Sequence, residues 1–293
     1  MSIKYQILRN ECFISKGQSM TEVHIIVLIV AGVGAGFATG LLGVGGGFFM
    51  VPVQFWVLKS IGIDPTIAIR IALGTNLLVV LPTALRGALV NHRRGAVVWN
   101  AGIALGSSAV IGAFLGAIIS SNLPGPIMTL MFGSLMIIVA LAMVTTPPPI
   151  TRTHSAVYRL PVFIFWGLIF GLVSGTLGVA GGAIYLPVMV FVLKFTVHQA
   201  VATSMVTMVF SAAGGAFSFL VNGLDVEGLP PYSTGYLNWL QWGLLSAGSI
   251  PMASVGVRVA HRLKGKTIQY IFACVLIFIG LKMTSFFEWF CYQ

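Results

Sequence analysis

Long apolar runs alternate with short polar or basic segments along most of the chain. A helix needs about 20 apolar residues to span a hydrocarbon core about 30 Å thick, and several of the runs reach that length. The pattern predicts an all-α polytopic membrane protein with eight helices, or ten if two interrupted helices are counted as halves. The expected spans are 23–42, 48–58, 66–91, 97–120, a span ending near 144, 160–177, 183–193, 197–221, 235–259 and 267–287.

A glycine-rich stretch interrupts the first of these runs. Val23–Leu58 would be roughly 54 Å long as one straight helix. Its centre holds Gly43, Gly45, Gly46 and Gly47, and a glycine inside a helix costs about 1 kcal/mol relative to alanine. Non-helical backbone at membrane depth needs partners from protein or from a water-filled cavity. The stretch therefore predicts a break in the helix and a candidate ligand site at that break.

The same stretch occurs a second time. The pattern Gly-x-x-x-Gly-x-x-Gly-Val-[GA]-Gly-Gly-x-x-x-x-Pro runs from Gly36 to Pro52 and again from Gly171 to Pro187. One span later in each half, Ala72–Asn76 pairs with Ala200–Ser204, and both segments end in small polar side chains. Interrupted hydrophobic segments at corresponding positions of two halves are typical of transporter binding sites.

These repeats divide the chain into four parts: an N-terminal tail (1–20), a first transmembrane repeat (21–145), a linker (146–157) and a second transmembrane repeat (158–290). Five crossings per repeat, an odd number, would invert the second repeat relative to the first. Lys and Arg after residue 20 then divide ten to three between the two sides, as the positive-inside rule requires. We expect this inverted arrangement with both termini outside, although the short pieces 48–58 and 183–193 equally fit re-entrant half-helices.

Composition and charge exclude several other classes of protein. The 293 residues are 57 % hydrophobic and 8 % charged, with a mean hydropathy of +0.99, whereas a soluble domain has about 25 % charged residues. The net charge of +10 comes from Lys and Arg in short loops, which is the positive-inside pattern rather than a nucleic-acid-binding surface. No nucleic-acid partner is expected.

The sequence carries no signal for catalysis. Its three cysteines have no paired spacing, its five histidines lack the i, i+4 spacing of a helical metal site, and no phosphate-binding glycine loop is present. We therefore expect no enzymatic activity, no metal and no cofactor.

The distribution of acidic residues favours an anionic ligand. None of the six acids falls at the centre of a span, whereas a cation pathway normally carries an intramembrane carboxylate. Helix N-termini near the two breaks would instead present N–H groups and positive dipole ends to an anion. The candidate substrate-binding residues are Gly43, Gly45, Gly46, Gly47, Thr75, Asn76, Gly178, Gly181, Gly182, Thr203 and Ser204.

Three ionisable residues could add positive charge or carry a proton along the path: Arg70, Arg86 and His198. Each has a structural alternative, because long cationic side chains snorkel to the interface and the histidine could be interfacial. The small and polar side chains of the candidate site also have one, since such residues are common in helix–helix contacts. The spacing of Gly167, Gly171 and Gly175 is typical of such a close-packing face.

The doubled glycine pattern, each copy followed by a small-Thr-Ser/Asn element, resembles the sulfite exporter TauE/SafE family over essentially residues 23–287. The resemblance implies a membrane transporter of small anions, chiefly sulfite and organosulfur compounds such as sulfonates, with two related halves packed about a central site. It makes the glycine breaks the signature segments and Thr75-Asn76 and Thr203-Ser204 the paired polar elements. Asn76 stands where the family often has serine, and Ala180 stands in the second copy where the first has Gly45.

We therefore predict a secondary transporter in the cell membrane that exports small anions such as sulfite or organosulfonates by alternating access about a central site. The expected partners are the anionic substrate, the lipid bilayer and, through the small-residue faces, a second copy in a homodimer. Two alternatives stay open: an anion channel or uniporter, and a cation-coupled transporter of another small organic solute.

Overall fold

The computed structural model describes residues 20–43, 45–145, 160–179 and 182–260, together with residues 277, 280, 281 and 283. Most of the expected tail, the linker and most of the last expected span lie outside these residues. The described helices are α2 (Glu22–Leu42), α3 (Gly47–Ser60), α4 (Pro65–His92), α5 (Trp99–Asn122), α6 (Gly125–Thr145), α7 (Leu160–Leu177), α8 (Gly182–Phe191), α9 (Val197–Asn222) and α10 (Trp239–Ala260). One pair of short strands, β1 (Ser233–Thr234) and β2 (Leu237–Asn238), precedes α10.

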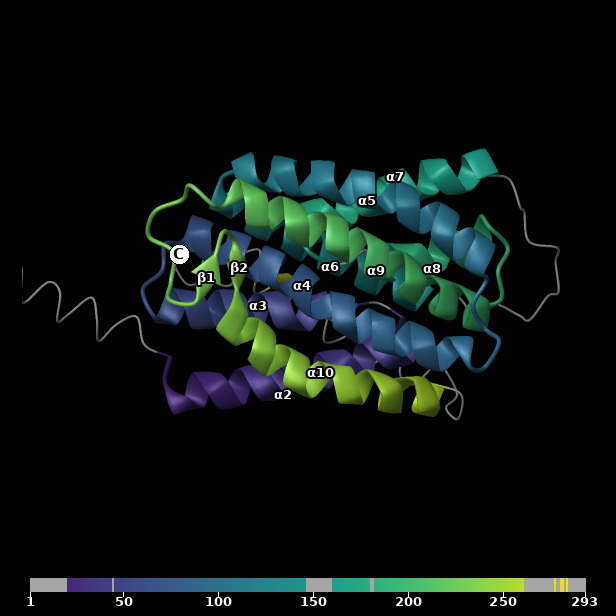
Figure 1. Cartoon of the computed structure of the whole chain (residues 1–293), viewed down its shortest axis with the longest axis horizontal. Coiled ribbons are helices and arrows are strands. Elements are labelled where there is room, and N and C mark those ends of the chain that lie inside the picture. The colour runs from purple at the N-terminus through teal and green to yellow at the C-terminus, as the bar shows by residue number, and fades with distance from the viewer. Residues whose placement is uncertain are drawn as a thin grey trace, which may run out of the picture.

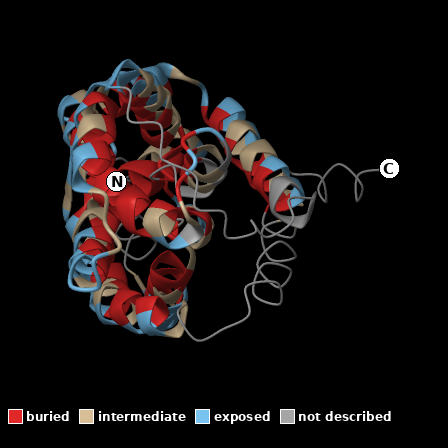
Figure 2. Cartoon of the chain, turned by 90° about the vertical axis from the view of Figure 1, so that its right-hand side faces the viewer, coloured by how far each residue is buried: buried red, intermediate tan, exposed pale blue. Residues whose placement is uncertain are grey.

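The helices run roughly along one axis of the molecule (Figure 1). Six of them are long and apolar enough to cross a membrane: α2, α4, α5, α7, α9 and α10. Large apolar side chains such as Val30, Ile111 and Ile138 are more than half exposed, as expected where a protein meets lipid tails. Buried residues lie where the helices face one another (Figure 2). The prediction of an all-α polytopic membrane protein is confirmed.

Two helix pairs form the edges of the molecule, with α2 against α10 and α5 against α7. A Cβ atom added to Gly32 or Gly40 would clash with the backbone of Leu245 or Ala253, respectively, so α2 and α10 run parallel and nearly touch. The α7 glycines Gly167, Gly171 and Gly175 lie against α5 in the same way. Glycines four residues apart allow this close approach, and the close-packing interpretation of the α7 glycines is confirmed.

Helices α4 and α9 lie between the two pairs (Figure 1). They run antiparallel, because Gly74 lies against Phe219 and Gly87 against Met205. The sequence pattern pairs these two helices as corresponding elements of the two halves, and inverted repeats would give them opposite directions. The division into two repeats itself stays a prediction.

The first glycine break reverses the chain. Helix α3 folds back along α2, so that Ser60 Oγ lies 3.0 Å from His24 Nε2 and the rings of His24 and Trp56 are 5.7 Å apart. With 14 residues, α3 is about 21 Å long, shorter than a hydrocarbon core of about 30 Å. The predicted break is therefore a tight hairpin between an apolar helix of full length and a shorter one.

One predicted boundary is wrong. The span expected from residue 235 begins at Trp239, because Ser233–Thr234 and Leu237–Asn238 pair as antiparallel strands around a turn at Gly235. Gly235 has a φ of +56°, which glycine adopts without strain. Asn238 then caps the helix, since its Oδ1 accepts a hydrogen bond of 2.9 Å from Gln241 N.

The α2–α10 contact predicts that substitution by alanine lowers stability at one glycine of α2 but not at another glycine two residues away. In Gly36→Ala the new methyl group would collide with the backbone of Ser249, and such overpacking costs about 1–3 kcal/mol. In the matched control Gly34→Ala the methyl group meets no atom within 4 Å. We expect a lower Tm for the detergent-purified Gly36→Ala protein and an unchanged or slightly higher Tm for Gly34→Ala. Equal Tm values for the two variants would contradict the close contact.

Candidate functional site

Each glycine break begins with a glycine in the left-handed conformation. Gly43 follows the end of α2 with a φ of +65°, and Gly178 follows the end of α7 with a φ of +62°. Glycine is the usual residue at such a helix end, because it has no Cβ to clash. The two residues occupy equivalent positions in the doubled sequence pattern. In the first break Gly45 and Gly46 also have positive φ values, of +85° and +59°.

The carbonyl oxygen of each of these glycines accepts a hydrogen bond from the other half of the chain. Ser204 Oγ of α9 shares its one proton between Gly43 O at 3.3 Å and Val201 O of its own helix at 2.9 Å, and Asn76 Nδ2 of α4 donates to Gly178 O. Both donor residues are completely buried. The two polar positions that pair in the sequence therefore donate to each other's breaks rather than to their own. We call the contact of Ser204 with Gly43 the first crossing and the contact of Asn76 with Gly178 the second crossing.

The backbone at the second crossing is packed too tightly for a side chain. A Cβ atom on Gly47, the first residue of α3, would lie 2.5 Å from Asn76 Nδ2 and 3.2 Å from Gly178 O. Gly47, Asn76 and Gly178 thus meet at one point, where the N-terminus of α3 faces a buried amide. Asn76 Oδ1 is buried and has no hydrogen-bond partner among the described residues. This point therefore combines a helix N-terminus, which favours anions, with one unsatisfied acceptor.

The first crossing is similarly close. A Cβ atom on Gly43 would lie 2.9 Å from Ser204 Oγ and 3.1 Å from Val201 Cγ1. On the second break, Gly182 is the first residue of α8, while Gly181 lies outside the described residues.

The hydroxyl groups of Thr75 and Thr203 accept hydrogen bonds from residues that precede helices. Thr75 Oγ1 accepts a hydrogen bond of 2.9 Å from Asn238 N, and Thr203 Oγ1 accepts one of 3.2 Å from Val98 N. Asn238 and Val98 each immediately precede a helix, α10 and α5 respectively. Both hydroxyl groups thus hold the start of a helix in the other half of the chain. Their predicted contact with a ligand stays a prediction.

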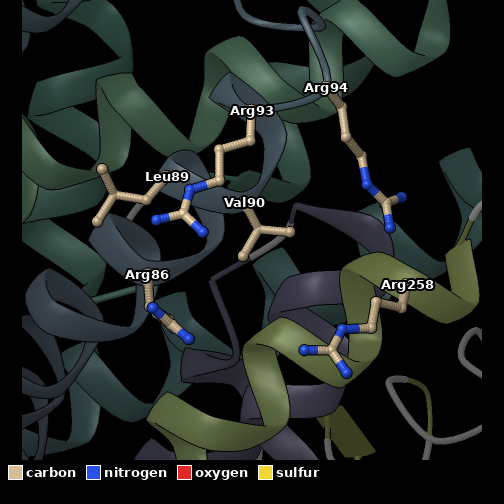
Figure 3. A pocket seen from close by; sticks show the side chains of 6 residues that line it. All are labelled: Arg86, Leu89, Val90, Arg93, Arg94 and Arg258. Atoms are coloured by element: carbon tan, nitrogen blue, oxygen red, sulfur yellow. The ribbon is translucent and has the colours of Figure 1, made fainter.

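The three ionisable candidates lie in different places. Arg70 donates hydrogen bonds of 3.0 Å to Tyr236 OH and to Leu123 O, which ties α4 to the turns next to α5 and α10. Arg86 donates from Nε to Ser254 Oγ at 2.9 Å and lines a cavity with three further arginines (Figure 3). His198 is exposed in the first turn of α9.

Sequence reasoning missed several buried polar side chains. The amide atoms of Gln54 and Gln241 are fully buried and have no hydrogen-bond partner among the described residues. Ser174, Tyr185 and Ser211 form a buried hydroxyl cluster, with oxygen–oxygen distances of 3.3 and 3.4 Å. A glutamine inside an apolar run was the available signal for Gln54, since unpartnered polar groups in a bilayer are costly.

The sequence of the chain matches that of a known protein family. Residues 28–283 match the sequence profile described as Sulfite exporter TauE/SafE. The chain belongs to the sulfite exporter TauE/SafE family. Because this is a family of membrane transporters, the protein is a multi-pass membrane transporter and not an enzyme.

Its curated relatives are similar along nearly their whole length. A "Probable membrane transporter protein YunE" of Bacillus subtilis (strain 168) is 26 % identical over 282 residues, covering 89 % of this chain and 97 % of the relative. A "Probable membrane transporter protein" of Haemophilus influenzae is 26 % identical over 259 residues, covering 88 % and 97 %. A probable membrane transporter of Methanocaldococcus jannaschii is also 26 % identical, covering 88 % and 94 %. No solved structure matches the chain.

The close contact of Gly43 with Ser204 predicts that Gly43 tolerates substitution by alanine less well than another glycine with a positive φ. Gly43→Ala adds both the strain of a positive φ and a collision with Ser204 and Val201. In the control Gly62→Ala, with a φ of +86°, the added methyl group meets no atom within 4 Å. The strain alone costs about 1–2 kcal/mol, and the collision adds about 1–3 kcal/mol.

We therefore expect the Tm of Gly43→Ala to fall clearly below that of Gly62→Ala in detergent solution. A larger loss of stability in Gly62→Ala would show that backbone strain, and not the crossing, governs this position.

Proposed function

We infer that this transporter moves small sulfur oxyanions, sulfite or organosulfonates, in the outward direction by alternating access about the two crossed breaks. The observation that carries the proposal is the junction of Gly47, Asn76 and Gly178, where a helix N-terminus meets a buried amide inside a membrane protein. The similarity to a family described as sulfite exporters supports the substrate class and the direction.

The charges of the described residues support an anion as the ligand. Glu22 lies in the first turn of α2, and Asp64 caps α4 by accepting a hydrogen bond of 2.8 Å from Thr66 N. Asp225 and Glu227 are exposed in the loop after α9. No acidic side chain lies in the interior of a helix within the described ranges, and no group of His, Cys, Asp or Glu there could hold a metal ion. A desolvated cation would therefore lack a counter-charge.

The free acceptor of Asn76 refines the substrate class. A fully ionised sulfate or sulfonate group offers only acceptors, whereas hydrogensulfite and amino- or hydroxysulfonates also carry a donor. The junction has no room for a methyl group on Gly47, so such a substrate enters only when Asn76 moves away from Gly178. It then accepts hydrogen bonds from backbone N–H groups at the start of α3 and donates to Asn76 Oδ1, which has no partner among the described residues. We expect hydrogensulfite to bind more tightly than sulfate for this reason.

The crossed hydrogen bonds also provide a route from binding to movement. Asn76 joins α4 to the end of α7, and Ser204 joins α9 to the end of α2. A substrate that competes for the Asn76 amide weakens one link between the two halves of the chain. Ligand binding then shifts the relative stability of two conformations by its differential affinity for them, which is what alternating access requires.

The variant Asn76→Asp tests this proposal. It nearly keeps the shape of the side chain but replaces the N–H donor with a carboxylate that repels an anion. Proteoliposomes with the variant should take up labelled sulfite or taurine about tenfold more slowly than wild type, because the carboxylate repels the anion, and a tenfold change corresponds to about 1.4 kcal/mol. The rise in Tm that sulfite or taurine produces should be smaller than in wild type as well.

The control is Asn100→Asp, the same chemical change at an exposed residue in the first turn of α5. We expect it to transport and to bind like wild type. Wild-type flux through a folded Asn76→Asp protein would overturn the proposal, and so would stabilisation of wild type by cations but by none of the sulfur anions. Flux that proceeds at channel rates, without saturation, would favour the anion channel.

A further inference from the structure

Four arginines surround one cavity near the ends of α4 and α10. The cavity has a volume of about 250 Å³ and is lined by Arg86, Leu89, Val90, Arg93, Arg94 and Arg258. Figure 3 shows the guanidinium groups arranged around this space. We propose that this arginine pocket is a second oxyanion site, which captures a sulfonate, sulfite or phosphate group before it reaches the crossed breaks.

Helix geometry brings these side chains to one face. Arg86, Leu89 and Val90 are three and four residues apart on α4, and Arg93 follows Arg86 at i+7, so they share a side of the helix. Arg258 lies in the last turn of α10, opposite this face. Its neighbour one turn earlier, Ser254, accepts the hydrogen bond from Arg86 Nε and so joins the two helices.

No described residue that lines the pocket neutralises its positive charge. None of its six lining residues is acidic. The bond to Ser254 uses Nε of Arg86 and leaves its two terminal nitrogens without a partner among the described residues. Helix C-termini favour nearby cations, which explains why arginines are tolerated at these ends. That effect does not require four side chains around one cavity, and a bound anion would relieve their mutual repulsion.

Guanidinium groups suit oxyanions in particular. Their planar fork donates two parallel hydrogen bonds to a carboxylate, phosphate or similar group. The same chemistry serves a free sulfite or phosphate ion and the phosphate of a lipid head group.

The position of the pocket next to the first crossing favours a free ion. Ala88, Met205, Val206 and Val257 form an apolar cluster, and both Val90 of the pocket and Val201 of the first crossing pack on it. Met205 touches the α4 backbone at Gly87, beside Arg86, whereas Val201 touches Gly43. An ion in the pocket is thus separated from the crossing by apolar side chains and could pass when they move. Clustered charge of this kind also raises the local concentration of counter-ions and the rate of capture.

The inference of an oxyanion site depends only on the residues of the arginine pocket. Its part in transport rests on the proposed function. The test uses the double variant Arg93→Gln/Arg258→Gln, which removes two exposed guanidinium groups and keeps the Arg86–Ser254 bond. The single variant Arg258→Gln provides a second measurement in case the double variant is unstable. Lys59→Gln, which removes an exposed cation at the end of α3, is the control for net charge.

The readout is the Tm in a neutral detergent during titration with sodium sulfite, sodium phosphate or a soluble short-chain phosphatidate, at ionic strength matched with sodium chloride. We expect saturable stabilisation of wild type and of Lys59→Gln, and an apparent Kd raised about tenfold in the double variant. Stabilisation by sulfite or phosphate identifies a free ion as the ligand, and stabilisation by phosphatidate alone identifies a lipid head group at the same oxyanion site.

The variant Asn76→Asp separates this inference from the proposed function. It should keep the arginine-dependent response even where transport of sulfur anions is lost or was never present. The inference is overturned if no oxyanion stabilises wild type beyond sodium chloride, or if the double variant responds as Lys59→Gln does.

Discussion

Hydrogen bonds from Asn76 to Gly178 O and from Ser204 to Gly43 O are the interactions on which the rest of this structure depends. A backbone that leaves the helix inside a bilayer exposes carbonyl and amide groups that lipid cannot satisfy. Here each left-handed glycine at the end of an edge helix finds its partner on a central helix of the other half. Each break therefore draws one of its hydrogen-bond partners from the other half of the chain.

The rest of the architecture brings these groups within reach of each other. Close packing of α2 on α10 and of α5 on α7 leaves α4 and α9 in the middle, antiparallel to each other. Thr75 and Thr203, one residue before the crossing donors, bind the starts of α10 and α5. Each central helix thus contacts both a break and a helix start of the opposite half, so that a shift of one half would change four hydrogen bonds together.

Acidic and basic side chains lie in different parts of the described structure. The acids of the described residues lie at helix starts or in loops, whereas Arg86, Arg93, Arg94 and Arg258 surround a cavity near the first crossing. Met205 and Val257 belong to an apolar cluster on which both Val90 of this pocket and Val201 beside Gly43 pack.

The sequence by itself determined the class of the protein, because hydropathy and glycine spacing are local properties that the bilayer selects directly. It located the described helices to within a few residues and the break at Gly43–Gly47, and it paired Asn76 with Ser204 as polar residues one helix after each break. Only the tertiary structure decided that Asn76 binds Gly178 rather than its own break, that Thr75 holds a helix start, and that Arg86 shares a cavity with Arg258. These contacts join residues more than 100 positions apart, and no local pattern encodes them, since they follow from which helix faces pack together.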